Sequence, residues 1–124
     1  MTDAGAPFAA RRVEKPWGFE LIWAESARYA GKTLHIERGQ QLSYQYHRQK
    51  DETIHVLTGV LELEVAAATG PRRTMRLSAG EGFHIPAGLR HRMTAIETCD
   101  VLEASTPELE DVVRLEDRYG RVKP

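Results

Sequence analysis

The chain has 124 residues and carries 17 basic and 18 acidic side chains, which leaves a net charge of −1. This length is sufficient for one domain with a single core and too short for two domains of ordinary size. The balanced charge gives no electrostatic reason to expect a nucleic-acid or membrane partner. Because Cys99 is the only cysteine, an internal disulfide framework and a cysteine-based zinc site are excluded.

Residues 1–12 are small or polar and show no periodicity, which is typical of a flexible terminus. They contain no secretory apolar region, and no later run is long enough to span a bilayer, so we expect a cytoplasmic location. Ordered structure is expected from residue 13, in a single domain over residues 13–124 that opens with a strand over residues 19–23. Trp17 and Trp23 lie close enough in sequence to predict burial, either in the domain or against a partner subunit.

From Tyr29 onward, short runs rich in Val, Ile, Leu, Thr and Tyr alternate with glycine, which predicts an all-β sandwich or barrel. Thr58 and Gly59 are interpreted as a tight hairpin between two strands. The tail over residues 107–115 is predicted to be helical or irregular, because a proline stands at its entry and acidic residues follow. The expected strands cover residues 32–37, 41–47, 52–58, 60–66, 74–77, 82–85, 90–95 and 101–105.

Four potential metal donors lie in two stretches of the chain. Gln45 and His47 are two residues apart and therefore share one face of a strand, and Glu52 is expected to return on the neighbouring strand after a short turn. His91 offers a fourth donor. Two imidazoles, one carboxylate and one amide oxygen suit a divalent ion with open positions for water or substrate. These residue types do not decide between Zn, Mn, Fe, Co and Ni.

Two further histidines differ in their expected direction. His55 is out of phase with Glu52 and Ile54, so it should face outward if Glu52 faces the interior. His84 precedes Pro86 on a predicted strand, where it either lines the cavity as a proton carrier or has a structural role.

The two donor-bearing stretches resemble the paired motifs of the cupin superfamily, G-x5-H-x-H-x3,4-E-x6-G and G-x5-P-x-G-x2-H-x3-N. The first motif corresponds here to Gly39, Gln45, His47, Glu52 and Gly59. The second corresponds to Gly80, Pro86, Gly88, His91 and Ala95. Gln45 replaces the first histidine of the pattern, and Ala95 replaces its terminal asparagine. The resulting set of Gln, His, Glu and His is similar to the metal set of phosphomannose isomerases.

Longer segments extend the resemblance to residues 13–121. They are similar to the C-terminal cupin module of type II mannose-6-phosphate isomerase/mannose-1-phosphate guanylyltransferase, and they read VEKPWGFELIW, GQQLSYQYH, IPAGLRHR and DVVRLEDRYGR. The resemblance implies a single-domain cupin jelly-roll β-barrel, one divalent metal, and aldose to ketose isomerisation of a sugar phosphate. The nucleotidyltransferase domain that precedes this module in the bifunctional enzymes is absent from the sequence, so guanylyl transfer is not expected.

An isomerase of this kind needs a base and a binding site for the substrate phosphate. His84 and Glu37 are the candidate bases. Lys32 and Arg90 are the preferred phosphate ligands, because they adjoin strands expected to open onto the cavity, although a solvated surface charge is the commoner role for such residues. Further cations that the tail and loops offer are Arg38, Arg48, Lys50, Arg114, Arg118 and Arg121.

Two other functions fit the same residues. One is a different metal-dependent cupin enzyme, such as an oxygenase or a lyase, and the other is a non-catalytic module that binds a carbohydrate or metabolite. If Gln45 and His47 face inward, Tyr44 and Tyr46 should face outward and need covering. We therefore expect a homodimer in which the N-terminal strand contributes to the interface.

Overall fold

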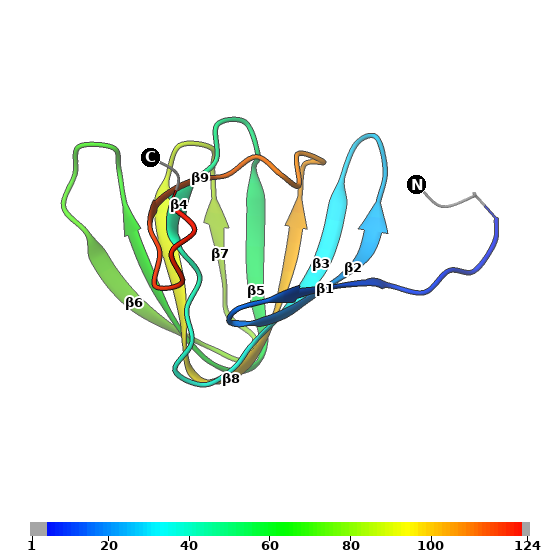
Figure 1. Ribbon diagram of the computed structural model, residues 1–124, viewed down its shortest axis with the longest axis horizontal. Coiled ribbons are helices and arrows are strands. Elements are labelled where there is room, and N and C mark those ends of the chain that lie inside the picture. Colours follow the sequence, from blue (N-terminus) through cyan, green and yellow to red (C-terminus); the bar gives the residue numbers. More distant parts are fainter. Residues whose placement is uncertain (1–4, 123–124) are drawn as a thin grey trace.

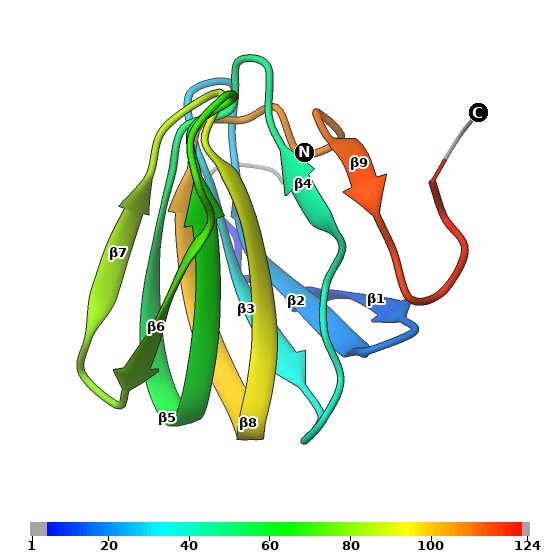
Figure 2. The same cartoon turned by 90° about the vertical axis from the view of Figure 1, so that its left-hand side faces the viewer.

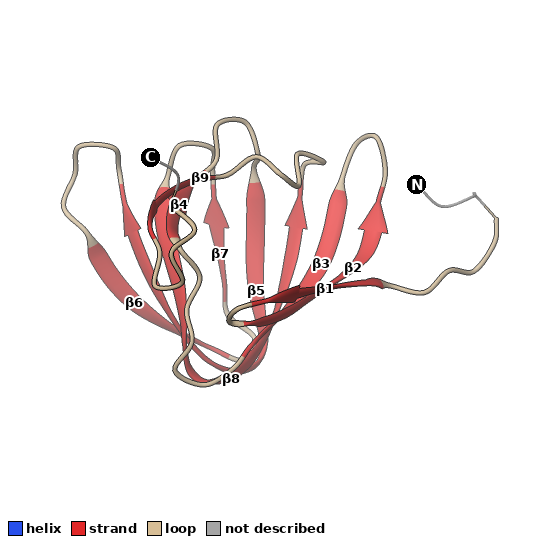
Figure 3. Ribbon diagram, in the orientation of Figure 1, coloured by secondary structure: helices blue, strands red, loops and turns tan. Residues whose placement is uncertain are grey.

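The computed structural model describes residues 5–122, which form nine strands and, within that range, no helix. The secondary structure in Figure 3 is accordingly made of strands and loops alone. No segment of the described chain is a helix long and apolar enough to cross a lipid bilayer. The strands are β1 (Arg11–Lys15), β2 (Gly18–Glu25), β3 (Ala30–Ile36), β4 (Tyr44–Tyr46), β5 (Glu52–Ala66), β6 (Arg73–Ser78), β7 (Gly82–Ile85), β8 (Arg90–Ser105) and β9 (Val113–Glu116).

The strands form one antiparallel sheet that curls around its inner face. Along one path the order is β1-β2-β3-β8-β4-β9, and β5 joins this path through β8 while also pairing with β6 and β7. The curl brings β6 and β7 to one side of the molecule and β4 and β9 to the other (Figure 2). The predicted all-β fold is confirmed. Strand β1 begins at Arg11, two residues before the expected start of ordered structure, and the strand expected over residues 19–23 is β2.

The hairpin predicted at Thr58 and Gly59 is wrong. Residues on both sides of Gly59 belong to one 15-residue strand, β5, which pairs with the 16-residue strand β8 over most of its length. The pairing register shifts between Val56 and Leu61, which marks a bulge. Gly59 has φ of 88°, and a Cβ atom there would lie 2.2 Å from the main-chain oxygen of Thr98. The glycine therefore permits a bend against β8 instead of a turn.

This bend decides where the inward side chains meet. In the ladder of β5 and β8, Glu52 pairs with Ser105, whereas His91 pairs with Val65 at the opposite end. Nevertheless the side chains of Glu52 and His91 approach to 3.4 Å. The ribbon must therefore fold over on itself, and Figure 1 shows both strands curving around the base of the molecule. The inner face at one end of the β5–β8 pair is thereby placed opposite the inner face at its other end.

Strand alternation separates the core from the surface. On β5, Glu52, Ile54 and Val56 are buried, and the residues between them are exposed, including His55 as predicted. Trp17 is buried within the core of its own chain, whereas Trp23 remains 42% exposed. The buried core cluster consists of Trp17, Leu34, Ile36, Leu42, Ile54, Val56, Leu61, Leu63, Val65, Leu77, Ile85, Met93, Ala95, Cys99 and Val101.

The C-terminal segment contains a strand where a helix was considered. Val113–Glu116 forms β9 and pairs with β4, so that Arg114 lies opposite Gln45. Turns and irregular backbone lead into this strand from Pro107. A proline followed by acidic residues favours helix entry locally, but pairing with the free edge of β4 satisfies the backbone hydrogen bonds of this segment.

The predicted exposed tyrosine patch is also absent from the described surface. Tyr44 is buried, with the Arg72 guanidinium 3.8 Å from its ring centroid and Arg92 at 5.6 Å. Arg90 lies 3.9 Å from the ring centroid of Tyr46. Arginine side chains therefore cover the outer faces of both rings within the same chain, through cation–π contacts.

Candidate metal centre

Three buried donors converge on the inner face of the curled sheet. His47 follows β4, Glu52 begins β5 and His91 lies at the start of β8. The Nε2 atoms of both histidines lie 3.4 Å from Oε1 of Glu52, and the three side chains can each offer one atom within 4.8 Å of the others. β5 is not paired with β4, contrary to expectation, so Glu52 reaches His47 across the interior.

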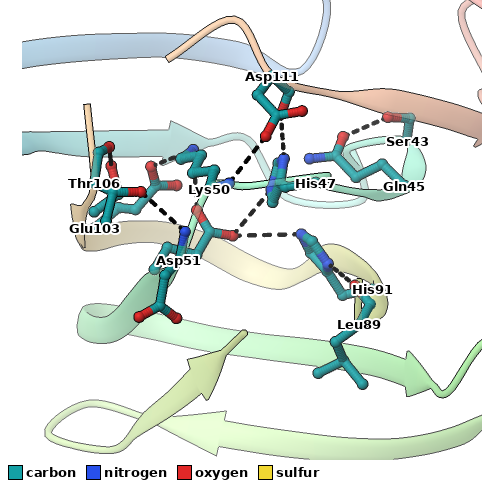
Figure 4. Close-up of polar contacts among 12 residues, drawn as sticks. Ser43, Gln45, His47, Lys50, Asp51, Leu89, His91, Glu103, Thr106 and Asp111 are labelled. Atoms are coloured by element: carbon teal, nitrogen blue, oxygen red, sulfur yellow. Dashed lines mark hydrogen bonds and ion pairs between the residues drawn. The ribbon is translucent and has the colours of Figure 1, made fainter. Parts of the chain in front are cut away.

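The other nitrogen of each imidazole is held by a main-chain carbonyl group. Nδ1 of His47 donates a hydrogen bond to the oxygen of Asp111 at 2.5 Å, and Nδ1 of His91 donates to the oxygen of Leu89 at 2.9 Å. Because Nδ1 carries the proton in each bond, Nε2 is left with its lone pair facing the shared centre (Figure 4). Such outer hydrogen bonds commonly fix the direction of metal-binding histidines.

The inner donor atoms lack partners in the way a metal site requires. Nε2 of His47, Nε2 of His91 and Oε1 of Glu52 are buried and make no hydrogen bond within the described residues, and Oε2 of Glu52 has only its ion pair with Lys50. Leaving such groups buried without a partner costs free energy. A divalent ion would accept all three lone pairs, and the two neutral imidazoles and one carboxylate suit its charge. The residues present therefore fit a divalent metal.

Gln45 lies beside this cluster on β4 and lines the same cavity. Its Oε1 atom accepts a hydrogen bond from the Ser43 hydroxyl at 2.6 Å (Figure 4). A half-turn of the amide would direct Oε1 toward the centre and let the amide nitrogen donate to the same hydroxyl. The side chain is thus placed near the three donors, and its service as a fourth ligand stays a prediction.

A buried chain of alternating charges adjoins the donors. Nζ of Lys50 lies 3.1 Å from Oε2 of Glu52 and donates to Oε2 of Glu103 at 2.9 Å. Nζ of Lys32 lies 3.7 Å from Oε2 of Glu103 and donates to Oε2 of Glu20 at 2.9 Å. Two ammonium groups thereby balance two of the three carboxylates, and the remaining negative charge lies close to the donor cluster.

Burial and neighbouring charge act in opposite directions on these groups. Burial raises the pKa of Glu52, but the adjacent Lys50 ammonium and the surrounding polar groups outweigh it and hold that pKa well below its usual range. Burial lowers the pKa of Lys50, and the two adjacent carboxylates outweigh it and raise the pKa overall. Burial and the charge of Glu52 raise the pKa of Glu103. Glu52 is therefore an anionic donor, and Lys50 is an ammonium ion.

The remaining predicted site residues are divided between the cavity and the surface. Lys32 lines the cavity, although it is already paired with Glu20. Arg90 does not line it and lies instead over Tyr46. His84 is 61% exposed and pairs with Asp51, and the exposed Glu37 pairs with His35. The two candidate bases are therefore placed outside the cavity, because His84 is on the exposed phase of β7 and Glu37 lies exposed just after the end of β3.

Sequence reasoning missed three polar residues that surround the donors. Glu103 follows Cys99 and Val101 at a spacing of two, so a charged residue at an apolar phase was the available signal. Glu20 gives the same signal two residues before Ile22. No local pattern indicated Asp111, whose contacts with residues 47–50 span more than 60 positions of the chain.

The cavity beside the donors has a volume of about 80 Å³, which suits an ion and a few waters. A neighbouring hollow of about 580 Å³ shares Lys15, Glu20, Lys32 and Leu109 with it. A ligand larger than a few waters would therefore extend from the donors into adjoining space. The charged side chains that line the cavity are Lys15, Glu20, Lys32, Lys50, Glu52, Glu103, Arg114 and Arg121.

A curled antiparallel sheet with two histidines and a glutamate on its inner face defines the metal-cupin class of site. The family model for the cupin domain matches residues 32–104. The chain belongs to the cupin family, which confirms the resemblance seen in its motifs.

Relatives and solved structures agree with this assignment. Mannose-1-phosphate guanylyltransferase ManC of Salmonella typhimurium is 32% identical over 118 residues, which cover 90% of this chain and 23% of that protein. The chain thus spans about a quarter of the length of this curated relative.

Two solved structures share the fold at lower identity. Oxalate decarboxylase of Lactobacillus farciminis superimposes with a TM-score of 0.78 at 18% identity, covering 93% of this chain and 37% of that one. KdgF from a Halomonas species gives a TM-score of 0.68 at 23% identity, covering 81% of this chain and 90% of that one.

Proposed function

We propose that this chain is a metal-dependent aldose to ketose isomerase that acts on a hexose phosphate such as mannose 6-phosphate. The observation that carries the proposal is the set of unpartnered buried donors of His47, Glu52 and His91, which adjoins Gln45 in a cationic cavity. The likeness to sugar-nucleotide enzymes supports the substrate class. Since the match covers only a quarter of that relative, activity and substrate are inferred from the site.

The reaction moves one proton between neighbouring carbons and needs no oxidant. The proton leaves C2 of the aldose and returns to C1, while the hydroxyl proton moves from the oxygen on C2 to the oxygen on C1. A bound divalent ion would polarise the substrate carbonyl and so acidify the C2 proton. Lys50, an ammonium ion buried 3.1 Å from Glu52, is suited to donate a hydrogen bond to an oxygen that gains negative charge.

Glu103 is the candidate proton carrier. It lines the cavity, it is fully buried, and its pKa is raised by burial and by Glu52. A carboxylate with a raised pKa is a better general base than one in water, because its pKa is closer to the working pH. Of the other two cavity carboxylates, Glu52 belongs to the donor set, and Glu20 lies beyond Lys32, at the end of the charge chain that is farthest from the donors. This assignment replaces His84 and Glu37, which lie outside the cavity.

The test is conversion of a panel of aldose phosphates by the chain, first stripped with a chelator and then loaded separately with Mn, Zn, Co, Fe or Ni. We expect ketose phosphate to form only with metal, and deuterium from the solvent to appear at the carbon that receives the proton. Glu103→Gln should bind metal as the parent does and lose turnover, whereas the exposed Glu81→Gln should change neither. No conversion with any metal would refute the isomerase.

The same panel separates the two alternatives. Oxygen consumption that requires iron would indicate an oxygenase. Tight binding of a sugar without chemical change would indicate a binding module.

We also propose that the chain forms a homodimer through its N-terminal strand. β1 pairs only with β2 among the described strands, so its outer edge is open to a second copy. Trp23 and Tyr29, on and after the adjoining β2, are 42% and 58% exposed. Light scattering at micromolar concentration should give twice the chain mass, and Trp23→Ser should lower that mass. A monomer in the parent chain would contradict the proposal.

A further inference from the structure

Three cationic side chains from widely separated segments line the same cavity. Lys15 is the last residue of β1, Arg114 lies in β9, and Arg121 follows the C-terminal turn. Arg114 is placed by the pairing of β9 with β4, where it lies opposite Gln45. The strand that carries a proposed metal ligand therefore also positions a cation at the wall of the cavity.

Two of these cations, Lys15 and Arg114, differ from the others in the cavity because they lack an ion-pair partner. Lys32 and Lys50 are bound to glutamates, and Arg121 makes a two-pronged ion pair with Asp117. Lys15 and Arg114 have no such ion pair within the described residues. Nε of Arg114 is in addition buried without a hydrogen-bond partner there. A buried guanidinium nitrogen with no acceptor is costly, so it indicates a missing ligand.

Mutual repulsion agrees with this geometry. Burial lowers the pKa of Lys15, and the charges of Lys32, Arg114 and Arg121 lower it further, against the opposing effect of Glu20. Burial and the charge of Arg121 lower the pKa of Arg114, against the opposing effect of Asp117. An anion bound among these groups would relieve the repulsion and supply the missing acceptor.

The adjoining hollows indicate which side the anion would occupy. The hollow of about 580 Å³ holds five carboxylates, Glu20, Glu25, Glu108, Glu110 and Asp111, against three cations. The hollow of about 290 Å³ holds Arg114 and Arg121 against Glu110 alone. An anionic group is repelled from the first and attracted to the second, so it is directed to the side of β9.

We propose that Lys15, Arg114 and Arg121 form a subsite for the phosphate of a phosphate monoester whose sugar end lies at the metal centre. This inference rests on the proposed function, because the subsite would bind the phosphate end of the same substrate. A phosphate monoester carries up to two negative charges and three acceptor oxygens, which match two uncompensated cations and a buried N–H donor better than a single carboxylate does. The preferred phosphate ligands are therefore Lys15 and Arg114, in place of Lys32 and Arg90.

The test measures binding to the metal-loaded chain by titration calorimetry with mannose 6-phosphate, mannose and a hexuronate. For Arg114→Gln we expect the Kd for mannose 6-phosphate to rise roughly 10- to 100-fold, the range that follows from loss of a charge-assisted hydrogen bond. Arg114→Lys should retain part of the affinity, and Lys15→Gln should weaken it independently. The affinity for mannose should not change in any variant.

The matched control is Arg73→Gln, which removes the same charge from an exposed position on β6. It should bind mannose 6-phosphate as the parent does. Thermal unfolding identifies a variant that does not fold. If Arg114→Gln does not fold, the affinity of Lys15→Gln, which changes a different strand, tests the subsite. Unchanged affinity for the phosphate ester in the folded Arg114 and Lys15 variants overturns the subsite. A loss of affinity for the hexuronate alone also overturns it.

Failure of the subsite and failure of the isomerase give different results. Phosphate-dependent binding that falls in the Arg114 variant, without turnover in the parent, supports the subsite and refutes the isomerase. Turnover in the parent with an unchanged KM in the Arg114 variant refutes the subsite and leaves the isomerase.

Discussion

The main-chain oxygen of Asp111 accepts a hydrogen bond from Nδ1 of His47 at 2.5 Å, and the side chain of the same aspartate binds the turn that follows His47. Its carboxylate accepts from the backbone N–H groups of Arg48, Gln49 and Lys50, at distances of 3.0, 2.7 and 2.9 Å. One residue of the C-terminal segment therefore fixes both the direction of an imidazole donor and the turn that carries a buried lysine (Figure 4).

Asp111→Ala should weaken metal binding without removing a donor. The main-chain bond to His47 remains possible, but three backbone N–H donors of the turn lose the carboxylate that accepts from them. We therefore expect metal affinity to fall about 10-fold and the free energy of unfolding to fall by about 1–2 kcal/mol. Competition with a chromogenic chelator and urea unfolding measure the two effects. Glu110→Ala, at the exposed neighbouring position, is the control and should change neither.

The stability lost in Asp111→Ala should depend on pH in a defined direction. Burial raises the pKa of Asp111, but the three N–H donors and His47 outweigh it and lower the pKa below its ordinary value of 3.8. The contribution of Asp111 to stability is therefore fully present above pH 3.8 and disappears as the pH falls through the lowered pKa. The difference in stability between the parent and Asp111→Ala should narrow at that acidic end. A constant difference down to pH 2 would contradict this assignment.

His91→Ala should remove one of the three buried donors and reduce metal affinity by more than about 100-fold. Elemental analysis of protein purified without chelator should show metal in the parent and none in the variant. His55→Ala removes an outward-facing histidine from the paired strand β5 and should retain the metal. In the parent, a metal at 100 times its Kd should stabilise the fold by about 2.7 kcal/mol, since it binds only the folded chain. Equal metal content in parent and His91→Ala would refute the proposed centre.

Lys50→Met should destabilise the metal-free chain and increase its response to metal. The substitution leaves Glu52 and Glu103 buried without their shared cation, and loss of one partner from such a pair costs about 3–5 kcal/mol. A divalent ion then supplies positive charge beside Glu52, so the rise in Tm on adding metal should be larger than in the parent. Arg48→Met changes an exposed cation two residues away and serves as the control. Equal metal-free stability of Lys50→Met and the parent would contradict the role of this charge chain.

Gly59→Ala tests whether the bend in β5 assembles the centre. Alanine there combines an unfavourable positive φ with a Cβ atom 2.2 Å from the oxygen of Thr98, so we expect a loss of at least about 2 kcal/mol and weaker metal binding. Gly39→Ala is the matched control, because Gly39 has φ of 81° and open space around its Cβ position. Urea unfolding should separate the steric clash from the cost of the backbone conformation. Equal losses in both variants would show that the close approach to β8 has no effect of its own.

The sequence contained the residues of the site but only part of their geometry. Alternation predicted correctly that Glu52 faces the interior and His55 the solvent, because the period of two is a local property of a strand. Gly59 was recognised as a backbone irregularity, yet whether such a glycine closes a hairpin or permits a bulge depends on the strand beside it. The carbonyl of Thr98 occupies that position, and its presence is a long-range fact.

The errors in the polar residues have the same origin. His84 and Glu37 are the candidate bases from the sequence, but neither lines the cavity, and they pair instead with Asp51 and His35. The roles of Glu103 and Lys50 depend on their contact with each other, which no local pattern predicts because they are 53 residues apart in sequence. Tyr44 was expected to need a second subunit, whereas Arg72 and Arg92 of the same chain cover it.

By itself the sequence determined the strand character of the chain, the inward phase of its donors and its membership of the cupin class, because residue type and periodicity act over a few neighbouring positions. The tertiary structure alone decided that Glu52 and His91 meet, although they begin at opposite ends of a paired ribbon. The bend at Gly59 closes that distance, and the C-terminal segment then adds Asp111 and Arg114 to the wall of the cavity. Each of these contacts joins residues far apart in the chain, and only the folded sheet brings them together.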